Sequence, residues 1–87
     1  MLSLTHAARQ HVADLLSKAG AGKVLRISSS PEGIRFAIDR VRIGDNTFND
    51  GDKCILAIDQ MVLRSVTGKT LDVEIDDGQP TLVLLGE

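Results

Sequence analysis

The chain has 87 residues, a formal net charge of −2 and 43% hydrophobic residues, which is typical of one small globular domain. Its aromatic residues are Phe36 and Phe48, and no basic stripe accompanies them, which argues against nucleic-acid binding. No apolar run approaches the roughly 20 residues that cross a bilayer, and the first residues lack the pattern of a secretory signal. We expect one domain over residues 1–87, located in the cytoplasm, where the single cysteine, Cys54, stays reduced.

The segment from Thr5 to Lys18 predicts an amphipathic helix, because apolar residues recur there at helical spacing. The apolar stripe consists of Ala8, Val12, Leu15, Leu16 and Ala19. Thr5 is suited to cap the first turn, and Gly20 is suited to end the helix in the left-handed conformation. A helix this short is marginal alone, so its stripe must pack on another element.

Residues 23–85 are typical of β-structure, interrupted by the segment 59–68. Residues 23–28 are rich in branched aliphatic side chains, and residues 34–39 and 71–76 alternate apolar with polar side chains. We expect Leu71, Val73 and Ile75 to face inward, and residues 40–43 to repeat the alternation as a further strand. Residues 53–58 are nearly all apolar, as in a strand covered on both faces. Residues 81–85 form the last predicted strand.

Turn signals separate these segments. They flank residues 47–48, where we expect a short strand that returns to residues 53–58. Asp77–Gly78 is a tight-turn pair, but the following Gln79–Pro80 favours a longer loop. Residues 59–68 predict a short helical turn, which Asp59 can cap and Gly68 can end. Because helix and strands are segregated, the sequence predicts an α+β fold with an N-terminal amphipathic helix packed on a small, mostly antiparallel β-sandwich.

Charged residues are unevenly distributed along the chain. Residues 1–43 carry seven Lys or Arg and three acids, whereas residues 44–87 carry three and nine. Ordinary pairing on the surface of one domain would explain this; the alternative is a basic face and an acidic face that meet in a homodimer or partner complex. Arg35, Arg40 and Arg42 are the candidate interaction residues, because guanidinium groups pair bidentately with carboxylates. Ordinary exposed arginines are the simpler interpretation.

Other candidate sites have weaker support. His6 and His11 are five residues apart, on different faces of the helix, so a metal-binding pair is not expected, and His11 should lie beside the apolar stripe. Ser28–Ser30 could form an anion cradle, although no glycine-rich phosphate motif is present. An acidic row could bind a hard cation, although a solubilising strand face is the simpler explanation. The row consists of Asp72, Glu74, Asp76 and Asp77. No serine has an arguable histidine–acid partner, so nucleophilic catalysis has no support. We expect no enzyme, no catalytic residue, no metal and no cofactor.

The order of these segments resembles the HesB/IscA-like family, the A-type carriers of iron–sulfur cluster assembly. The opening LSLTHAARQHVADLL is similar to the family's leading helix, and LRI is similar to its first core strand. The stretch DNTFNDGDKCILAID is similar to the family's middle segment, and LRSVTGKTLDVEI is similar to a later strand with the leucine and glycine before it. The resemblance extends over nearly the whole chain and implies the fold of that family.

The resemblance also implies where cluster ligands would lie. Family members usually carry a Gly-Gly-Cys-Ser-Gly segment after the first core strand and two further cysteines after the last strand. Here PEGIRF occupies the first place: Gly33 and Phe36 keep the glycine and aromatic positions, and Pro31 stands where the cysteine would be. The second place lies beyond the TLVLLGE that closes this sequence. All three thiolates that the family would supply are therefore missing from these positions.

Iron–sulfur clusters are held mainly by thiolates, and Pro31 offers no side-chain ligand. Cys54 lies in an apolar strand and is expected to be a small core residue whose thiolate would be poorly solvated. We therefore predict a HesB/IscA-like domain that has lost cluster ligation and acts as a protein-interaction or accessory module related to cluster assembly, with a protein partner or a second copy. The alternative is iron or a cluster held at a subunit interface through Cys54 and non-cysteine ligands.

Overall fold

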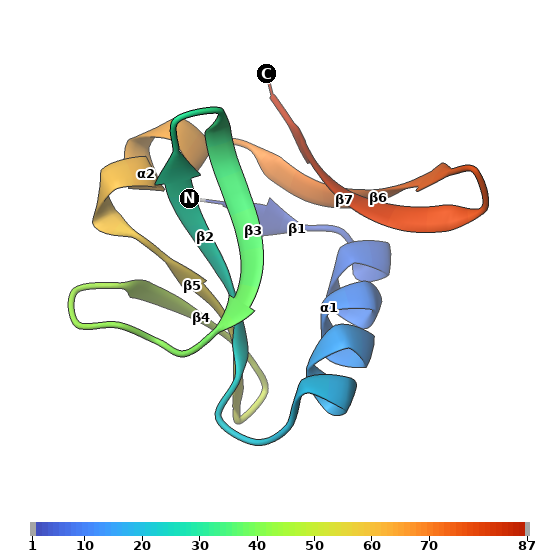
Figure 1. Ribbon diagram of the computed structural model, residues 1–87, viewed down its shortest axis with the longest axis horizontal. Helices are drawn as coiled ribbons and strands as arrows, with labels where there is room; N and C mark the ends of the chain where they lie inside the picture. Colours follow the sequence, from blue (N-terminus) through green and yellow to red (C-terminus); the bar gives the residue numbers. More distant parts are fainter. Residues whose placement is uncertain (1, 87) are drawn as a thin grey trace.

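The computed structural model describes residues 2–86, which form seven strands and two helices (Figure 1). In chain order the elements are β1 (Ser3–Leu4), α1 (His6–Ala19), β2 (Val24–Ser30), β3 (Gly33–Asp39), β4 (Asn46–Asp50), β5 (Lys53–Ile58), α2 (Gln60–Val66), β6 (Thr70–Asp76) and β7 (Gln79–Leu85). Within residues 2–86, no helix has the length and apolar character needed to cross a membrane.

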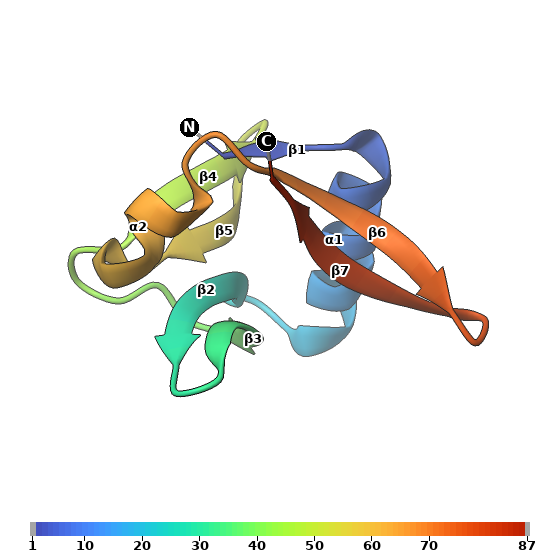
Figure 2. The same cartoon turned by 90° about the horizontal axis from the view of Figure 1, so that it is seen from above.

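The strands form two sheets, with strand orders β1-β6-β7 and β3-β2-β5-β4. The pairs β2–β3, β4–β5 and β6–β7 are antiparallel, whereas β1–β6 and β2–β5 are parallel. Figure 2 shows the sheets as separate layers, with α1 against the β6–β7 hairpin. The predicted α+β class, with a helix on a small and mostly antiparallel pair of sheets, is confirmed.

Helix α1 turns its apolar stripe toward both sheets. Ala8, Val12 and Leu16 are buried, as the helical spacing predicts. The Thr5 hydroxyl accepts a hydrogen bond from the Ala8 N–H at 3.1 Å, which confirms the predicted N-cap. Gly20 follows the helix with φ 99° and ψ 173°, so it ends the helix at positive φ but outside the left-handed helical region that we expected.

The core lies between the two helices and the inner faces of the sheets. Its largest completely buried side chains are Ile27, Leu56, Leu71, Val12 and Val66. Strand β5 runs inside the four-stranded sheet and is buried from Ile55 to Ile58, which explains its unbroken apolar sequence. Asp59 follows directly and caps α2 by accepting a hydrogen bond from the Met61 N–H at 2.8 Å, as predicted.

The prediction of a strand at residues 40–43 is wrong, because carboxylates bind the amides that a neighbouring strand would need. The Arg40 N–H donates to Asp39 Oδ1 at 2.7 Å, and the Arg42 N–H donates to Asp45 Oδ2 at 2.9 Å. Ile43, an apolar residue of the predicted alternation, is exposed to solvent. Residues 40–45 therefore form a loop between β3 and β4, named loop 40–45 below.

Three further details differ from the sequence prediction. Asp76 pairs with Gln79, so Asp77 and Gly78 alone form a tight turn, with φ of 51° and 77°, instead of a longer loop. The β6–β7 hairpin extends past the core, which leaves Ile75 69% exposed rather than inward-facing. Strand β1 was not predicted, because its two residues are too few to show a period.

Candidate functional site

The tip of the β2–β3 hairpin contains the position at which the family resemblance places a cysteine. Ser30 pairs with Gly33, which leaves Pro31 and Glu32 as the turn residues. Ser30 Oγ accepts a hydrogen bond from the Glu32 N–H at 3.3 Å and donates to the Gly33 carbonyl oxygen at 3.1 Å. Gly33 has φ 123°, a conformation that L side chains avoid. Position 31 is thus an exposed turn residue without a side-chain atom that could bind a metal.

Cys54 lies at the other end of the same sheet. Leu56 pairs with Leu25 in the parallel β2–β5 ladder, so Cys54 is level with Lys23. Pro31 is eight residues further along the chain, which corresponds to about 26 Å at about 3.3 Å per strand residue. Within one chain, Cys54 therefore cannot supply the ligand that position 31 lacks.

The expectation that Cys54 is a core residue is wrong in one respect. Its side chain is half-buried rather than part of the buried core, which begins at the next residue, Ile55. The thiol contacts the Leu56 carbonyl oxygen at 3.8 Å, and it lines a shallow cavity together with Lys23 and Lys53. Cys54 is thus a residue at the margin of the core.

Arg26 is a buried charged residue, with a side chain 9% exposed, and the side chain of its partner Asp45 is 3% exposed. It lies on the face of β2 opposite to Leu25 and Ile27, which belong to the core. Its Nε and Nη2 donate to the two carboxylate oxygens of Asp45 at 2.9 and 2.8 Å, and Nη2 also donates to Asp59 Oδ2 at 3.2 Å. Arg26 thereby ties loop 40–45 and the start of α2 to the sheet.

These contacts also favour the charged forms of Asp45 and Arg26. The hydrogen bond from Arg26 lowers the pKa of the Asp45 carboxyl below its ordinary value, and the Asp45 carboxylate raises the pKa of Arg26. Sequence reasoning missed this cluster. The available signal was an arginine between Leu25 and Ile27 in a strand otherwise suited to the core, since a charge there requires a carboxylate partner.

The three predicted interaction arginines do not lie together. Arg35 is exposed on the outer face of β3. Arg42 donates through Nη2 to Asp39 Oδ2 at 3.0 Å in an exposed ion pair. Arg40 lies apart from both, against Gly22, where an added Cβ would come within 3.3 Å of its Nη1. Arg35 and Arg42 share a surface that Arg40 does not, and a role in binding stays a prediction for all three.

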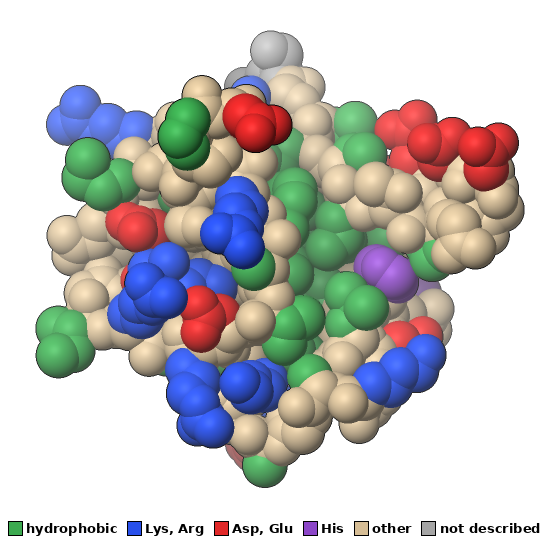
Figure 3. Space-filling view, viewed as in Figure 1, with side chains coloured by type: hydrophobic (Ala, Val, Ile, Leu, Met, Phe, Trp, Pro, Cys, Tyr) green, Lys and Arg blue, Asp and Glu red, His purple; other side chains and the backbone are tan. Residues whose placement is uncertain are grey.

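Arg35 and Arg42 line a polar cavity of about 290 Å³ on the outer face of the β2–β3 hairpin. The cavity is also lined by Arg26, Ser28, Ser29, Asp39 and Asp59. Figure 3 shows Lys and Arg side chains gathered mainly over β2, β3 and the neighbouring loop, and a group of carboxylates at the opposite edge of the same face, on the β6–β7 hairpin. Ser28–Ser30, which we considered as an anion cradle with weak support, belong to β2 and pair with β3 rather than forming a loop.

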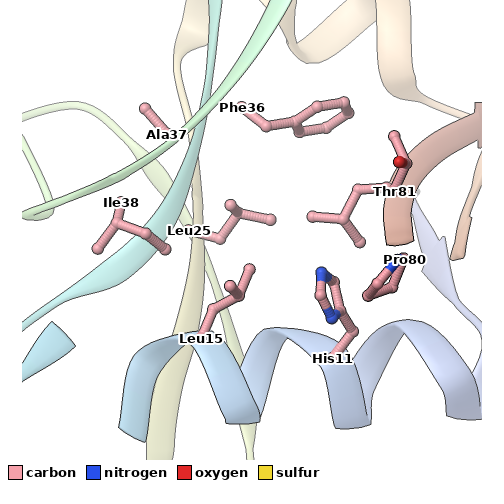
Figure 4. A pocket seen from close by; sticks show the side chains of 9 residues that line it. His11, Leu15, Leu25, Phe36, Ala37, Ile38, Pro80 and Thr81 are labelled. Carbon is pink, nitrogen blue, oxygen red and sulfur yellow. The ribbon is translucent and has the colours of Figure 1, made fainter. Parts of the chain in front are cut away.

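A second cavity, of about 340 Å³, lies where α1 meets the two sheets (Figure 4). His11 and Leu15 project into it from α1, Leu25 and Phe36 come from the four-stranded sheet, and Pro80 comes from β7. This confirms that His11 lies beside the apolar stripe. The lining is mostly apolar, with His11 and Thr81 as its polar side chains.

The acidic row does not form a cation site within one chain. Asp72 accepts hydrogen bonds from the Thr5 hydroxyl at 2.7 Å and from the Val73 N–H at 2.8 Å, and these bonds lower the pKa of Asp72. Glu74 and Asp76 are exposed along the β6–β7 hairpin. Across residues 2–86, no three or more His, Cys, Asp or Glu side chains are grouped so that they could hold a metal ion.

The structure has the α+β fold of two solved proteins, SufA and IscA. The crystal structure of SufA from Escherichia coli, involved in biosynthesis of iron–sulfur clusters, matches 98% of this chain and 84% of its own, with a TM-score of 0.76 and 19% identity. The crystal structure of IscA with the [2Fe-2S] cluster matches 99% of this chain and 82% of its own, with a TM-score of 0.68 and 21% identity.

A protein from Aquifex aeolicus, solved by NMR, is also similar: it matches 99% of this chain and 91% of its own, with a TM-score of 0.72 and 22% identity. No family model and no curated protein matches the sequence. The predicted HesB/IscA-like fold is therefore confirmed by structural likeness. The single cysteine, Cys54, is consistent with a divergent example of that fold.

Proposed function

We propose that this protein keeps the HesB/IscA fold without ligating an iron–sulfur cluster, and that it acts as a non-enzymatic interaction or accessory module in cluster assembly. The observation that carries the proposal is the turn at Pro31, which offers no donor at the position where the resemblance places a thiolate. Cys54 lies about 26 Å away along the sheet, by the strand spacing of about 3.3 Å per residue, so it does not replace that ligand.

The link to cluster assembly rests on the structural neighbours. SufA is described as involved in biosynthesis of iron–sulfur clusters, and IscA was solved with a [2Fe-2S] cluster. A protein that shares their fold but not a thiolate at position 31 can still present the same surfaces to a partner or to a second copy of itself. A cytoplasmic location is part of the proposal, since a lone half-buried thiol suits a reducing compartment.

Anaerobic reconstitution tests the loss of ligation. The purified protein is incubated with ferrous iron, sulfide and a thiol reductant and then desalted, with IscA treated in parallel as the positive control. We expect IscA to show the visible absorption of a cluster, and this protein to show none above a Cys54→Ser variant, with iron well below one atom per chain. A stable, stoichiometric cluster in this protein would refute the proposal.

The interaction role requires its own test. The tagged protein is used as bait in extracts of its native cells, beside an Arg35→Glu variant, and light scattering after size exclusion measures self-association. We expect cluster-assembly proteins or a second copy to be retained by the natural sequence. Retention of neither, at native expression levels, would contradict an interaction role.

The position of Cys54 favours one alternative. Because the thiol is half-buried and lines a cavity, it can be reached in the folded state, and two copies could hold iron or a cluster through their Cys54 thiolates and neighbouring carboxylates or histidines. This alternative expects native Cys54 to react with a thiol reagent, and Cys54→Ser to lose bound iron. Reaction only after denaturation would exclude it.

A further inference from the structure

The polar cavity on the outer face of β2–β3 contains hydrogen-bond donors that the protein does not use. Among the described residues, the Arg35 guanidinium, the Ser28 hydroxyl and Nη1 of Arg26 make no hydrogen bond or ion pair with another residue. Arg35 and Ser28 are directly opposite each other in the β2–β3 ladder, and Arg26 is the next residue of β2 on the same face. The three groups therefore line one site.

Each carboxylate oxygen beside this site accepts a hydrogen bond from the protein. Both carboxylate oxygens of Asp39 accept hydrogen bonds, one from the Arg42 guanidinium and one from a backbone N–H. Both oxygens of Asp59 do the same, one with Arg26 and one with a backbone N–H. A ligand entering the cavity meets donors that have no protein partner, beside carboxylates whose oxygens each accept one hydrogen bond from the protein. An oxyanion can accept hydrogen bonds from those donors.

We propose that this cavity binds the carboxylate or phosphate group of a small anion. Arg35 and Ser28 supply donors from the two strands of the hairpin, and Arg26 supplies its Nη1 from the most buried position. Asp39, Asp45 and Asp59 balance the charges of Arg26, Arg35 and Arg42 around the site, so the preference for an anion rests on the unused donors rather than on net charge. The volume of about 290 Å³ lies just below the range of about 300–1,000 Å³ for small-molecule sites, which suits a small anion better than a nucleotide.

The site is also partly preorganised. Asp45 and Asp59 hold the Arg26 guanidinium in one orientation, and the Ser28 backbone is fixed in the β2–β3 ladder. Binding would have to order only the exposed Arg35 side chain, which limits the entropy lost on association. This inference goes beyond the proposed function and does not depend on it.

Nuclear magnetic resonance titration of the ¹⁵N-labelled protein tests the site, with citrate and inorganic phosphate in separate arms and sodium chloride matched for ionic strength. We expect saturable shifts at Ser28, Arg35 and their neighbours, and a rise in melting temperature with ligand concentration. Saturation by citrate alone identifies a carboxylate site, and saturation by phosphate alone identifies a phosphate site. Saturation by neither anion overturns the proposal.

Two variants that each remove one positive charge test whether the anion binds in this cavity. Arg35→Gln removes the free guanidinium of the cavity, whereas Arg40→Gln removes one that lies apart, against Gly22. Arg35→Gln should weaken binding by about tenfold or more, since hydrogen bonds to charged groups are lost. Arg40→Gln should change binding by no more than about twofold, as expected for a change in screened, distant charge.

Equal weakening by the two variants would mean that net charge alone attracts the anion, and it would overturn the proposal. Arg35 is exposed, and its side chain makes no hydrogen bond or ion pair within residues 2–86, so circular dichroism of Arg35→Gln should match that of the natural sequence. Reconstitution with iron and sulfide does not involve these residues. The anion site and the loss of cluster ligation can therefore each fail without the other.

Discussion

Replacement of Asp45 with alanine should lower the free energy of unfolding by about 3 kcal/mol. The change removes two hydrogen bonds of 2.8 and 2.9 Å from the Arg26 guanidinium, whose side chain is 9% exposed. Removal of one partner from a buried ion pair usually costs about 3–5 kcal/mol, and the remaining bond to Asp59 places the expected loss at the lower end of that range. Loop 40–45 would also lose the bond from the Arg42 N–H to Asp45.

Urea unfolding followed by circular dichroism measures this loss, and thermal unfolding gives an independent value. For a domain of this size, about 4–8 °C of melting temperature correspond to 1 kcal/mol, so the expected drop is about 12–24 °C. Asp50→Ala is the matched control, because its carboxylate pairs with Arg9 at 3.4 Å while both side chains are about half exposed. That variant should lose less than about 1 kcal/mol.

A loss below about 1 kcal/mol in Asp45→Ala would refute the reasoning, because a well-buried guanidinium without its main partner must cost more than an exposed one. The double variant Arg26→Met, Asp45→Leu removes both charges, so it distinguishes the cost of an unpaired buried charge from the loss of the other contacts. If desolvation of an unpaired charge is the cause, the double variant should be more stable than Asp45→Ala alone. A double variant less stable than Asp45→Ala would contradict that cause.

Three further predictions test the helix, the charge state and the turn. Leu16→Ala should cost about 3 kcal/mol and Leu15→Ala about half as much, because Leu16 is 2% exposed whereas Leu15 lines a cavity; equal losses in urea unfolding would show that the buried helix face is misplaced. The pKa of Asp45 is lowered on folding, so its ionised form stabilises the protein above the unfolded-state pKa of about 3.9 and that stabilisation is lost as the pH falls through the folded-state pKa. The difference in unfolding free energy between the natural sequence and Asp45→Asn should therefore shrink toward pH 2, and a constant difference would contradict the shift. Gly33→Ala should cost about 1–2 kcal/mol, because an L side chain is strained at φ 123°; an unchanged urea midpoint would mean that the turn relaxes.

Most secondary structure followed from local pattern. The apolar stripe of α1, the N-cap Thr5 and the apolar run of β5 can each be recognised from the types and spacing of residues that are close together in the sequence. The errors arose where a local pattern competes with a distant contact. Residues 40–43 alternate like a strand, but Asp39 and Asp45 bind the backbone amides of this segment. Ile75 alternates correctly within β6, yet the hairpin extends beyond the core, so it stays exposed.

Some features of the candidate site could be predicted from the sequence, and others depended on tertiary contacts. The absence of a donor at Pro31 is readable from the residue itself, because proline has no side-chain ligand wherever the chain places it. The separation of Arg40 from Arg35 was not readable, because it depends on the loop between β3 and β4 and not on residue spacing. The same holds for Cys54, whose distance from position 31 follows from the parallel pairing of β5 with β2.

By itself the sequence determined the types and order of the elements other than β1 and loop 40–45. It also determined the resemblance to the HesB/IscA-like family and the lack of a thiolate at position 31, since residue identity and short-range periodicity carry each of these. Tertiary structure alone decided that Arg26 is buried and that Asp45 and Asp59, 19 and 33 residues away along the chain, converge on it. Carboxylates are common in this sequence, and only the packing of a loop and a helix start against one face of β2 selects which two of them neutralise the buried charge.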